Sequence, residues 1–410
     1  MRILLATIGS DGDLQPFYAF ARRLLGEGHE VTLAANERYA TRARALGIPF
    51  VSVAPPWDEA AMRPRIEKIL AAPAPLRQLA LVVDAFVDEE RASIQGLRTL
   101  AEAADVVIHT PFFVAAAAVA RVTKTKHVTV HFAPMHKASG YGPSGQNLGA
   151  WFNVLGWHLA GSMVRRATDS QLNTIVEAVG IPPWRDILLS ASHSTLLDFI
   201  AVSPHVIPKD ASWGEATRVC GYWFLDEPGF VPPKPLEDFV SGAEPPVVLG
   251  FGSMPAFPAD AITKKIVEAV DGLRRRVVLM SGWAGLGKIP LPDHVLAADF
   301  VPHGWLFRRA ACVVHHGGAG TTAAAFRAGI PQAVVWHLGD QSMWGRKVSQ
   351  LGVGPKTIFH KKLTAKGLRR QIDTLLSNEG MRARAARLGA VVRAEDGLGD
   401  ASRALIAVAR

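Results

Sequence analysis

The stretch VVHHGGAGTTAAAFRAGIP, residues 313–331, places three glycines within four residues between an apolar run and an alanine-rich segment. The apolar run is typical of a buried strand, and Thr321–Ala328 is predicted to form a short helix that ends before Gly329. Backbone N–H groups at a helix start can approach an anion closely when no side chain covers them, and the helix dipole adds partial positive charge. The pattern therefore predicts a phosphate site, with a plain tight turn as the alternative.

The polar side chains around this turn also suit an anion. Thr321 or Thr322 can cap the helix and donate a hydroxyl, and His316 can donate a ring N–H to the same oxygens. A Walker A loop would need a lysine after the glycines, and a dinucleotide site would need GxGxxG in the first turn, which reads GSDGDL. A nucleoside triphosphatase and a dehydrogenase are therefore disfavoured.

Strands and helices alternate with short connections on both sides of this motif. RILLATI, HEVTLAA and PFVSVA read as strands separated by helical segments, and the same order restarts at PVVLGF with a helix over 260–273. This alternation predicts an α/β fold with a doubly wound parallel sheet in each of two domains. We expect a first domain over 1–224, a proline-rich linker over 225–246, a second domain over 247–385, and a helical tail over 386–410 that packs back toward the first domain.

Composition and charge narrow the class of protein. The chain has 410 residues, of which 49% are hydrophobic, so each domain can bury a core. The formal net charge is +9, but the basic residues are scattered, and the run Arg274–Arg276 is typical of a helix terminus, so we expect no nucleic-acid partner. Cys220 and Cys312 lack a CxxC or Cys/His spacing, which argues against a disulfide scaffold or a zinc site.

The lengths of the apolar runs indicate where in the cell the protein is expected. No apolar run reaches the roughly 20 residues that span a bilayer, so we expect a cytoplasmic protein. Long insertions between 55 and 102 and between 134 and 223 carry many aromatic residues. Ordinary core packing explains each aromatic residue alone, but insertions of this length usually line a site, and Phe132, Trp151 and Trp157 are candidates for binding a hydrophobic acceptor. Together with the positive charge, they leave open a weak peripheral association with the inner face of the membrane.

A second polar pair lies near the glycine turn. Asp340 and Gln341 follow the predicted strand QAVVW, at the same edge of the sheet. A carboxylate beside an amide is typical of sugar recognition, although Asp340 is also in place to begin the helix QSMWGRKVSQL. A phosphate site and a hydroxyl-binding pair together indicate a nucleotide sugar.

These motifs occur in an order that resembles a known family. GSDGDLQPFYAFARRLLGEGHEVTLAA, GFGSMP, FVPHGWLF, HHGGAGT, AGIPQ, GDQ and LGVGP together resemble the nucleotide-sugar-dependent family 1 glycosyltransferases of the GT-B fold. The chain is most similar to the bacterial sterol and natural-product glucosyl- or rhamnosyltransferases. The resemblance spans both domains and is strongest over residues 1–53 and 246–355.

The resemblance implies two Rossmann-like domains that face each other across a cleft. A UDP- or dTDP-sugar would bind to the second domain and the acceptor to the first, with no metal required. The donor-binding positions that the resemblance implies are Ser10, Gly12, Ser253, Val301, His316, Gly318, Gly320, Thr321, Asp340 and Gln341. Plant relatives stack a tryptophan on the base where this chain has Phe300, which leaves the stacking residue open.

The resemblance also places the general base in the loop after the first strand, where this chain has Asp13. A carboxylate there can accept the proton of an attacking hydroxyl, and direct displacement with one base inverts the anomeric carbon. The alternative is that Asp13 only caps a helix beginning at Leu14. Asp11-Gly12-Asp13 also has the DxD spacing of metal-dependent transferases, but the glycine turn already serves the leaving group. His109, after a strand, is a second catalytic candidate that can hydrogen-bond the acceptor or Asp13.

The prediction is therefore an inverting glycosyltransferase, monomeric or homodimeric, that moves glucose or rhamnose from a UDP- or dTDP-sugar to a hydroxyl of a sterol, polyketide or hydroxy-lipid. Two alternatives stay open. A sugar-nucleotide epimerase on the same fold would form product from the donor alone. A catalytically silent partner protein would keep the donor motifs without the base.

Overall fold

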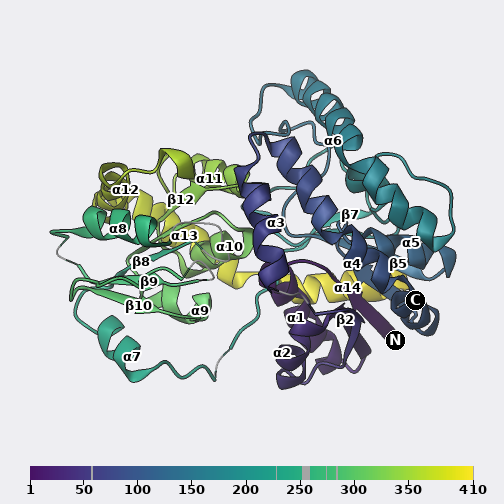
Figure 1. Ribbon diagram of the computed structural model, residues 1–410, viewed down its shortest axis with the longest axis horizontal. Coiled ribbons are helices and arrows are strands. Elements are labelled where there is room, and N and C mark those ends of the chain that lie inside the picture. The colour runs from purple at the N-terminus through teal and green to yellow at the C-terminus, as the bar shows by residue number, and fades with distance from the viewer. Residues whose placement is uncertain (57–58, 228, 252–258, 274, 283–284, 410) are drawn as a thin grey trace. The chain divides into compact units, whose positions relative to one another are not determined.

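Two parallel sheets, each in its own compact unit of the chain, form the architecture shown in Figure 1. The computed structural model describes residues 1–410 except 57–58, 228, 252–258, 274, 283–284 and 410. One unit comprises Met1–Leu225 with Glu395–Arg410, and the other comprises Asp226–Ala394. The predicted α/β fold with two doubly wound sheets is confirmed.

The first unit holds a seven-stranded sheet in the order β3-β2-β1-β4-β5-β6-β7, with parallel pairing throughout. Its strands are β1 Arg2–Ala6, β2 Glu30–Asn36, β3 Phe50–Ala54, β4 Val106–His109, β5 Lys126–His131, β6 Asp198–Ile200 and β7 Thr217–Val219. Its helices are α1 Asp11–Gly26, η1 Glu37–Tyr39, α2 Ala40–Ala45, α3 Glu59–Ala71, α4 Pro75–Ala103, α5 Val114–Val122, α6 Ala150–Val179, the π-helical η2 Ile187–Ala191 and α14 Gly397–Ala409.

Alternate residues of β1 face opposite sides of this sheet, as the period of a strand requires. Ile3 and Leu5 belong to a buried cluster that includes residues of α1 and α14, whereas Leu4 and Ala6 belong to a cluster formed with α4, α5 and α6. The strand is apolar on both faces because helices cover both faces of a parallel sheet.

The second unit holds a six-stranded parallel sheet in the order β10-β9-β8-β11-β12-β13. Its strands are β8 Val247–Gly250, β9 Val277–Met280, β10 Val295–Ala298, β11 Cys312–His315, β12 Gln332–Trp336 and β13 Ile358–Phe359. Its helices are α7 Lys234–Val240, α8 Ala259–Val270, α9 His303–Leu306, η3 Phe307–Arg309, α10 Ala319–Ala328, α11 Gln341–Gln350, η4 His360–Lys362, α12 Ala365–Ser377 and α13 Glu379–Ala394.

The stretch expected to be a linker, residues 225–246, contains the short helix α7. Leu236 and Val240 of α7 are buried with Val248 and Val313 in a core cluster of the second unit. The carboxylate of Asp226 accepts a bidentate pair of hydrogen bonds from the guanidinium of Arg327 within the same unit. Pro232, Pro233, Pro235, Pro245 and Pro246 of this stretch lie outside the helix or in its first turn, where a missing N–H costs little.

The chain returns to the first unit after Ala394, and α14 packs on α1 there. Gly397 begins this helix against the backbone of Gly221, so closely that an added Cβ would lie 2.7 Å from the carbonyl carbon of Gly221. Ala401, Ala404 and Leu405 of α14 then enter the core of the first unit. The last helix is therefore a structural part of the first unit.

Both sheets reverse their strand order at one place, between β1 and β4 in the first unit and between β8 and β11 in the second. Ligands of open α/β sheets bind outside the carboxyl ends of the strands at such switch points. The loop after β1 carries Asp13, and the turn after β11 carries the three glycines. The strand order therefore predicts ligand binding at the same two loops that carry the sequence motifs.

Candidate active site

The glycine turn after β11 is shaped by close packing at its first two positions. Gly317 has φ +89°, and a Cβ there would lie 2.7 Å from Cγ1 of Val334 and 2.9 Å from the carbonyl oxygen of Gln341. A Cβ on Gly318 would lie 2.4 Å from Nε2 of His316. Side chains are excluded at these two positions by neighbouring protein atoms and, at Gly317, by the backbone conformation.

Gly320 differs from these two glycines. A Cβ on Gly320 would meet no atom of the described residues within 4 Å, so the first turn of α10 is open at this position. Packing among the described residues gives no reason for glycine here. An uncovered helix start with a positive dipole end is the arrangement that binds phosphate.

The start of α10 differs from the sequence prediction. The helix begins at Ala319 with Gly318 as its N-cap, so neither Thr321 nor Thr322 caps it. The hydroxyl of Thr322 instead donates to the carbonyl oxygen of Gly318 at 2.8 Å. A threonine inside the first turns can bond back to the carbonyl four residues earlier, and that contact replaces the predicted cap. Thr321 is half-buried in the same turn.

Two histidines precede the turn and have different roles. His315 is buried, its Nδ1 accepts the backbone N–H of Gly317 at 3.0 Å, and its Nε2 donates to the side-chain oxygen of Gln332 at 2.8 Å. These two contacts use both ring nitrogens and hold the turn in place. Burial lowers the pKa of His316 to about 4, so its ring is neutral near pH 7, and its Nδ1 has no hydrogen-bond partner among the described residues.

Asp340 and Gln341 lie at the start of α11, as the sequence predicted for a helix beginning there. Asp340 is the N-cap residue, and its Oδ2 accepts the indole N–H of the buried Trp344 at 2.9 Å. The side-chain oxygen of Gln341 accepts the backbone N–H groups of His337 and Leu338 at 2.8 and 3.2 Å. Both lone pairs of that oxygen are thereby used, so Gln341 would contact a sugar through its amide nitrogen.

The structure describes three of the four remaining residues that were predicted to bind the donor sugar nucleotide. Val301 is buried, and the adjacent Phe300 is 70% exposed, which leaves an aromatic face available beside the backbone of Val301. Ser253 lies outside the described residues. Ser10 and Gly12 belong to the first unit, where both are exposed at the start of α1.

Asp13 lies in the first turn of α1, where hydrogen bonds from Ser10 fix its carboxylate. The helix begins at Asp11 and not at Leu14, with Ser10 as its N-cap, so Asp13 occupies the third helical position. Its Oδ2 accepts the backbone N–H of Ser10 at 2.8 Å and the hydroxyl of Ser10 at 3.0 Å. Burial raises the pKa of Asp13 above its ordinary value, and the two bonds from Ser10 offset part of that rise. A raised pKa strengthens a carboxylate as a proton acceptor.

His109, which the sequence predicts to hydrogen-bond the acceptor or Asp13, has other partners within the first unit. The side chain is fully buried at the end of β4, its Nδ1 lies 2.9 Å from the carbonyl oxygen of Thr110, and its Nε2 lies 3.1 Å from Nδ1 of His127. Both ring nitrogens are thus used inside the sheet. Burial lowers the pKa of His109 to about 3, and the geometry assigns it a packing role.

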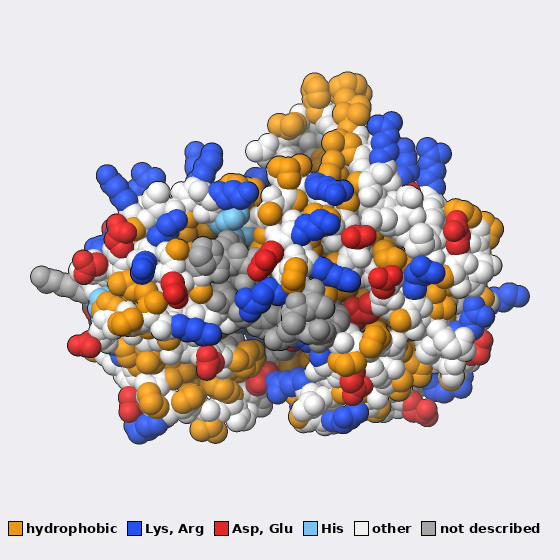
Figure 2. All heavy atoms as spheres, in the orientation of Figure 1, with side chains coloured by type: hydrophobic (Ala, Val, Ile, Leu, Met, Phe, Trp, Pro, Cys, Tyr) orange, Lys and Arg blue, Asp and Glu red, His pale blue; other side chains and the backbone are white. Residues whose placement is uncertain are grey.

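The three residues predicted to bind the acceptor, Phe132, Trp151 and Trp157, differ in the solvent exposure of their side chains. Trp157 is buried and donates its indole N–H to the carbonyl oxygen of Tyr141 at 2.7 Å, and Phe132 packs edge-on against Phe17. Trp151, by contrast, is 69% exposed on α6. Further exposed hydrophobic side chains on or just before α6 are Leu148, Phe152, Val154, Leu155, Leu159 and Met163, which with Trp151 we call the α6 apolar patch. Figure 2 shows hydrophobic side chains gathered over α6 with Lys and Arg beside them.

Two features of the structure do not follow from the sequence pattern. They are the positioning role of His315 and Gln332, and a group of three histidines and an aspartate in the first unit. The doublet His315-His316 marks a site with two adjacent imidazoles in the sequence, but strand register decides which of the two rings holds the glycine turn.

Among the described residues, no helix combines the length and apolar character needed to cross a bilayer.

Two family models match the chain. A model described as the glycosyltransferase family 28 N-terminal domain matches residues 3–120, and a model described as the C-terminal domain of erythromycin biosynthesis protein CIII-like proteins matches residues 266–404. The chain is 31% identical over 420 residues to O-mycaminosyltylonolide 6-deoxyallosyltransferase of Streptomyces fradiae, covering 98% of this chain and 96% of that protein. It is 30% identical to a sterol 3-beta-glucosyltransferase of Arabidopsis thaliana, covering 98% of this chain and 65% of the plant protein.

Solved structures share the fold at lower sequence identity. The glycotransferase of kitacinnamycin superposes with a TM-score of 0.76 at 19% identity, covering 100% of this chain and 99% of that chain. The spinosyn rhamnosyltransferase SpnG complexed with thymidine diphosphate superposes with a TM-score of 0.70 at 19% identity, covering 99% of this chain and 100% of that chain. The relative with 31% identity is matched over nearly its whole length. The N-terminal and C-terminal domain models match the first and second parts of the chain, respectively. The chain therefore belongs to the glycosyltransferases of the GT-B fold.

Proposed function

We propose that this glycosyltransferase moves a hexose, glucose or rhamnose, from a UDP- or dTDP-sugar to a hydroxyl of a hydrophobic acceptor such as a sterol, a polyketide or a hydroxy-lipid. The observation that carries the proposal is the open first turn of α10 at Gly320, beside the sheet's switch point. The names of the Streptomyces fradiae and Arabidopsis thaliana relatives support this acceptor range, and the thymidine diphosphate in the SpnG structure supports the nucleotide.

On the donor side, the helix start at Gly318–Gly320 would stabilise the diphosphate as it leaves. The N–H groups of the first turn and the neutral ring of His316 supply hydrogen bonds, and Asp340 with the amide nitrogen of Gln341 would bind the sugar hydroxyls. Phe300 offers an exposed ring on which the base can stack. The proposal includes no divalent cation at the diphosphate, because the helix start supplies the positive potential.

Asp13 would act as the general base. The acceptor hydroxyl loses its proton to Oδ1 or Oδ2 of Asp13 while its oxygen forms a bond to the anomeric carbon. The bond from that carbon to the diphosphate oxygen breaks on the opposite face, and the nucleoside diphosphate leaves with the electron pair. One displacement of this kind inverts the anomeric configuration, and general-base catalysis contributes about 10² to 10⁴ in rate.

The test is product formation by the full chain from UDP- or dTDP-sugars and an acceptor library, followed by mass spectrometry. We expect Asp13→Asn to fold, to bind the donor, and to lose about 10² or more in turnover, because the amide cannot accept the proton. Asp11→Asn, two residues away on the same helix, should retain turnover and serves as the control.

Other outcomes identify the alternatives. Conversion of the donor without an acceptor would show an epimerase, and donor binding without turnover in the wild type would show a catalytically silent protein. Full turnover by Asp13→Asn would reject the assignment of the base.

The α6 apolar patch and the positive net charge also support a peripheral location on an anionic membrane surface at the cytoplasmic face. Trp151, Leu155, Leu159 and Met163 are spaced by four residues, so they line one face of α6. A membrane would supply hydrophobic acceptors directly to the unit that carries this helix.

A further inference from the structure

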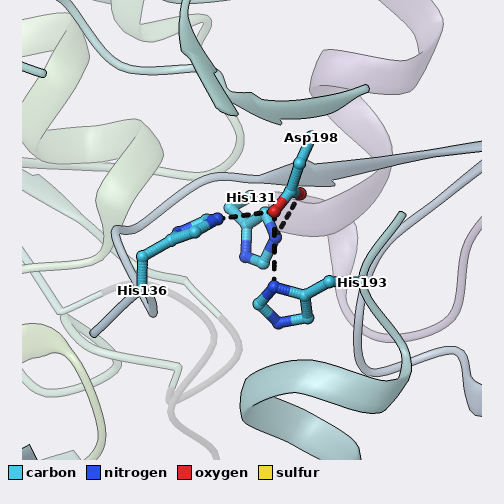
Figure 3. A group of neighbouring side chains, drawn as sticks. All are labelled: His131, His136, His193 and Asp198. Atoms are coloured by element: carbon cyan, nitrogen blue, oxygen red, sulfur yellow. Dashed lines mark hydrogen bonds and ion pairs between the residues drawn. The ribbon is translucent and has the colours of Figure 1, made fainter. Parts of the chain in front are cut away.

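Four side chains in the first unit converge on one point (Figure 3). His131 ends β5, His136 lies in the following loop, His193 follows η2, and Asp198 begins β6. Each residue offers one nitrogen or oxygen atom, and these four atoms lie within 4.8 Å of one another. His131, His136 and Asp198 are buried, and the side chain of His193 is only 11% exposed.

The three imidazole rings surround the carboxylate of Asp198. Nε2 of His131 lies 2.8 Å from Oδ1, Nε2 of His136 lies 2.6 Å from Oδ2, and Nδ1 of His193 lies 3.3 Å from Oδ2. The ring centroids are 4.4 to 5.2 Å apart, with interplanar angles of 60° to 62°. The rings thus approach one centre from different directions, as ligands of a tetrahedral ion do.

The contact of His193 requires a positive species between two acceptors. Nε2 of His193 lies 3.0 Å from the carbonyl oxygen of Leu188, which can only accept, so this nitrogen carries the ring proton. In the neutral ring, Nδ1 then presents a lone pair to Oδ2 of Asp198. Two lone pairs at 3.3 Å repel each other unless a proton or a metal cation lies between them.

The neighbouring residues orient this group as the outer shell of a metal site does. The hydroxyl of Thr129 donates to Oδ1 of Asp198, and the backbone N–H of Ser194 donates to the same hydroxyl at 3.1 Å. The hydrogen bond of His193 to Leu188 fixes the orientation of its ring. Nδ1 of His131 and of His136 have no hydrogen-bond partner among the described residues, so His193 is the one ring of the three whose outer nitrogen is held in this way.

We propose that His131, His136, His193 and Asp198 form a structural zinc site. Three imidazole nitrogens and one carboxylate oxygen match the ligand number and type of a closed tetrahedral zinc centre. With bonds of about 2.0–2.1 Å, tetrahedral ligand atoms lie about 3.3 Å apart. Nδ1 of His193 already lies at this distance from Oδ2 of Asp198, and the contact of His136 with Oδ2 would lengthen by about 0.7 Å on binding. The more widely separated ligand atoms, which lie within 4.8 Å of one another, would move closer together.

The zinc ion would join two segments that are far apart in sequence, residues 131–136 and residues 193–198. It would tie the end of β5 and the following loop to the residues between η2 and the start of β6. Because all four positions of a tetrahedral ion are filled by protein, the site would stabilise the first unit and take no part in the transfer. The inference therefore stands independently of the proposed donor and acceptor.

The experiment measures zinc in the full chain after reconstitution with zinc sulfate and gel filtration. We expect about one zinc ion per chain by mass spectrometry of the metal, and X-ray absorption should show four nitrogen or oxygen ligands at about 2.0–2.1 Å and no sulfur. Zinc should raise the melting temperature of the reconstituted protein above that of protein stripped by a strong chelator.

His136→Gln and His193→Gln should each lose at least tenfold in zinc affinity, and zinc should no longer raise their melting temperature. The matched control is His127→Gln, which removes a partly buried histidine from the same sheet outside the cluster and should keep the zinc. Circular dichroism checks that all variants fold. A reconstituted wild type without zinc would show a cluster held by protons alone and overturn the proposal, and so would zinc retained in both ligand variants.

Discussion

Asp13 shows how the neighbours of one carboxylate set its chemistry. Burial raises its pKa, the hydroxyl and backbone N–H of Ser10 lower it, and the negative charge of Asp11 raises it. These influences act within the first four residues of the helix start. They can be changed singly without altering the carboxylate itself.

The pH dependence of kcat/KM should report these influences. A general base works only when deprotonated, so the rate should fall as the pH decreases through the pKa of Asp13, which burial places above the ordinary value. Ser10→Ala removes a hydrogen bond to the carboxylate and should move this acid limb to higher pH. Asp11→Asn removes a like charge and should move it to lower pH. Acid limbs that move in the same direction, or remain in place, would contradict Asp13 as the base.

Gly320 allows stability and donor binding to be separated. Alanine fits the open space and favours a helix, so Gly320→Ala should stabilise the fold by up to about 1 kcal/mol in denaturant titration. The added methyl group would stand where the diphosphate is proposed to bind, so affinity for UDP or dTDP by calorimetry should fall about tenfold or more, or about 1.4 kcal/mol.

The matched control is Gly26→Ala, at the end of α1, where a Cβ also meets no atom within 4 Å. This variant should gain similar stability and bind nucleotide as the wild type does. Unchanged nucleotide affinity in Gly320→Ala would show that the helix start is not the phosphate site.

Among the helices, α4 carries a buried carboxyl that is directed at the start of α5. Glu90 is 2% exposed, and its Oε2 accepts the backbone N–H of Ala115 at 2.8 Å. Burial raises the pKa of Glu90 from its ordinary value near 4.5 to about 8. The contact between α4 and α5 is therefore made by a carboxyl that is protonated near pH 7.

This shift predicts a pH-dependent stability. Because the pKa of Glu90 is higher in the folded chain, folding takes up a proton between about pH 4.5 and pH 8, and the free energy of unfolding should decrease as the pH rises through that window. Glu90→Gln keeps an oxygen for Ala115 and should lose less stability between pH 6 and pH 9 in urea titration. The exposed Glu102→Gln, on the same helix, should behave as the wild type. An equal loss in wild type and Glu90→Gln would contradict the raised pKa.

The exposed face of α6 predicts binding to lipid. We expect the full chain to sediment with vesicles containing phosphatidylglycerol, less so as salt is added. Replacing Trp151, Leu155 and Leu159 by serine should reduce the bound fraction strongly. Val231→Ser removes an 83% exposed valine of the other unit and should change nothing. Sedimentation of the triple variant at the wild-type level would exclude α6 as the membrane surface.

For the whole molecule, the sequence predicted what depends on local pattern. The apolar strands, the alternation with helices and the glycine turn at Gly317–Gly320 are all signals within a few residues of one another. Helix starts were wrong by two or three residues at Asp11 and Ala319, because capping depends on which backbone N–H groups find partners.

Features that depend on distant residues escaped prediction. The role of His109 follows from its pairing with His127 on the adjacent strand, which no spacing reveals. Cysteine spacing gives no zinc signal in this chain, whereas the histidine cluster joins residues from β5 to β6 that are brought together only by the fold. Trp151 and Trp157 looked alike in sequence and differ in the structure, because they lie on different faces of α6.

The glycine-to-glycine contact between Gly397 and Gly221 has a practical consequence for engineering. Since α14 completes the core of the first unit, cutting the chain at Leu225 would expose the apolar side chains that this helix covers. A hybrid enzyme that borrows sugar specificity from a relative should therefore replace residues 226–394 as an internal cassette, with both splice points matched, and retain the native carboxyl terminus.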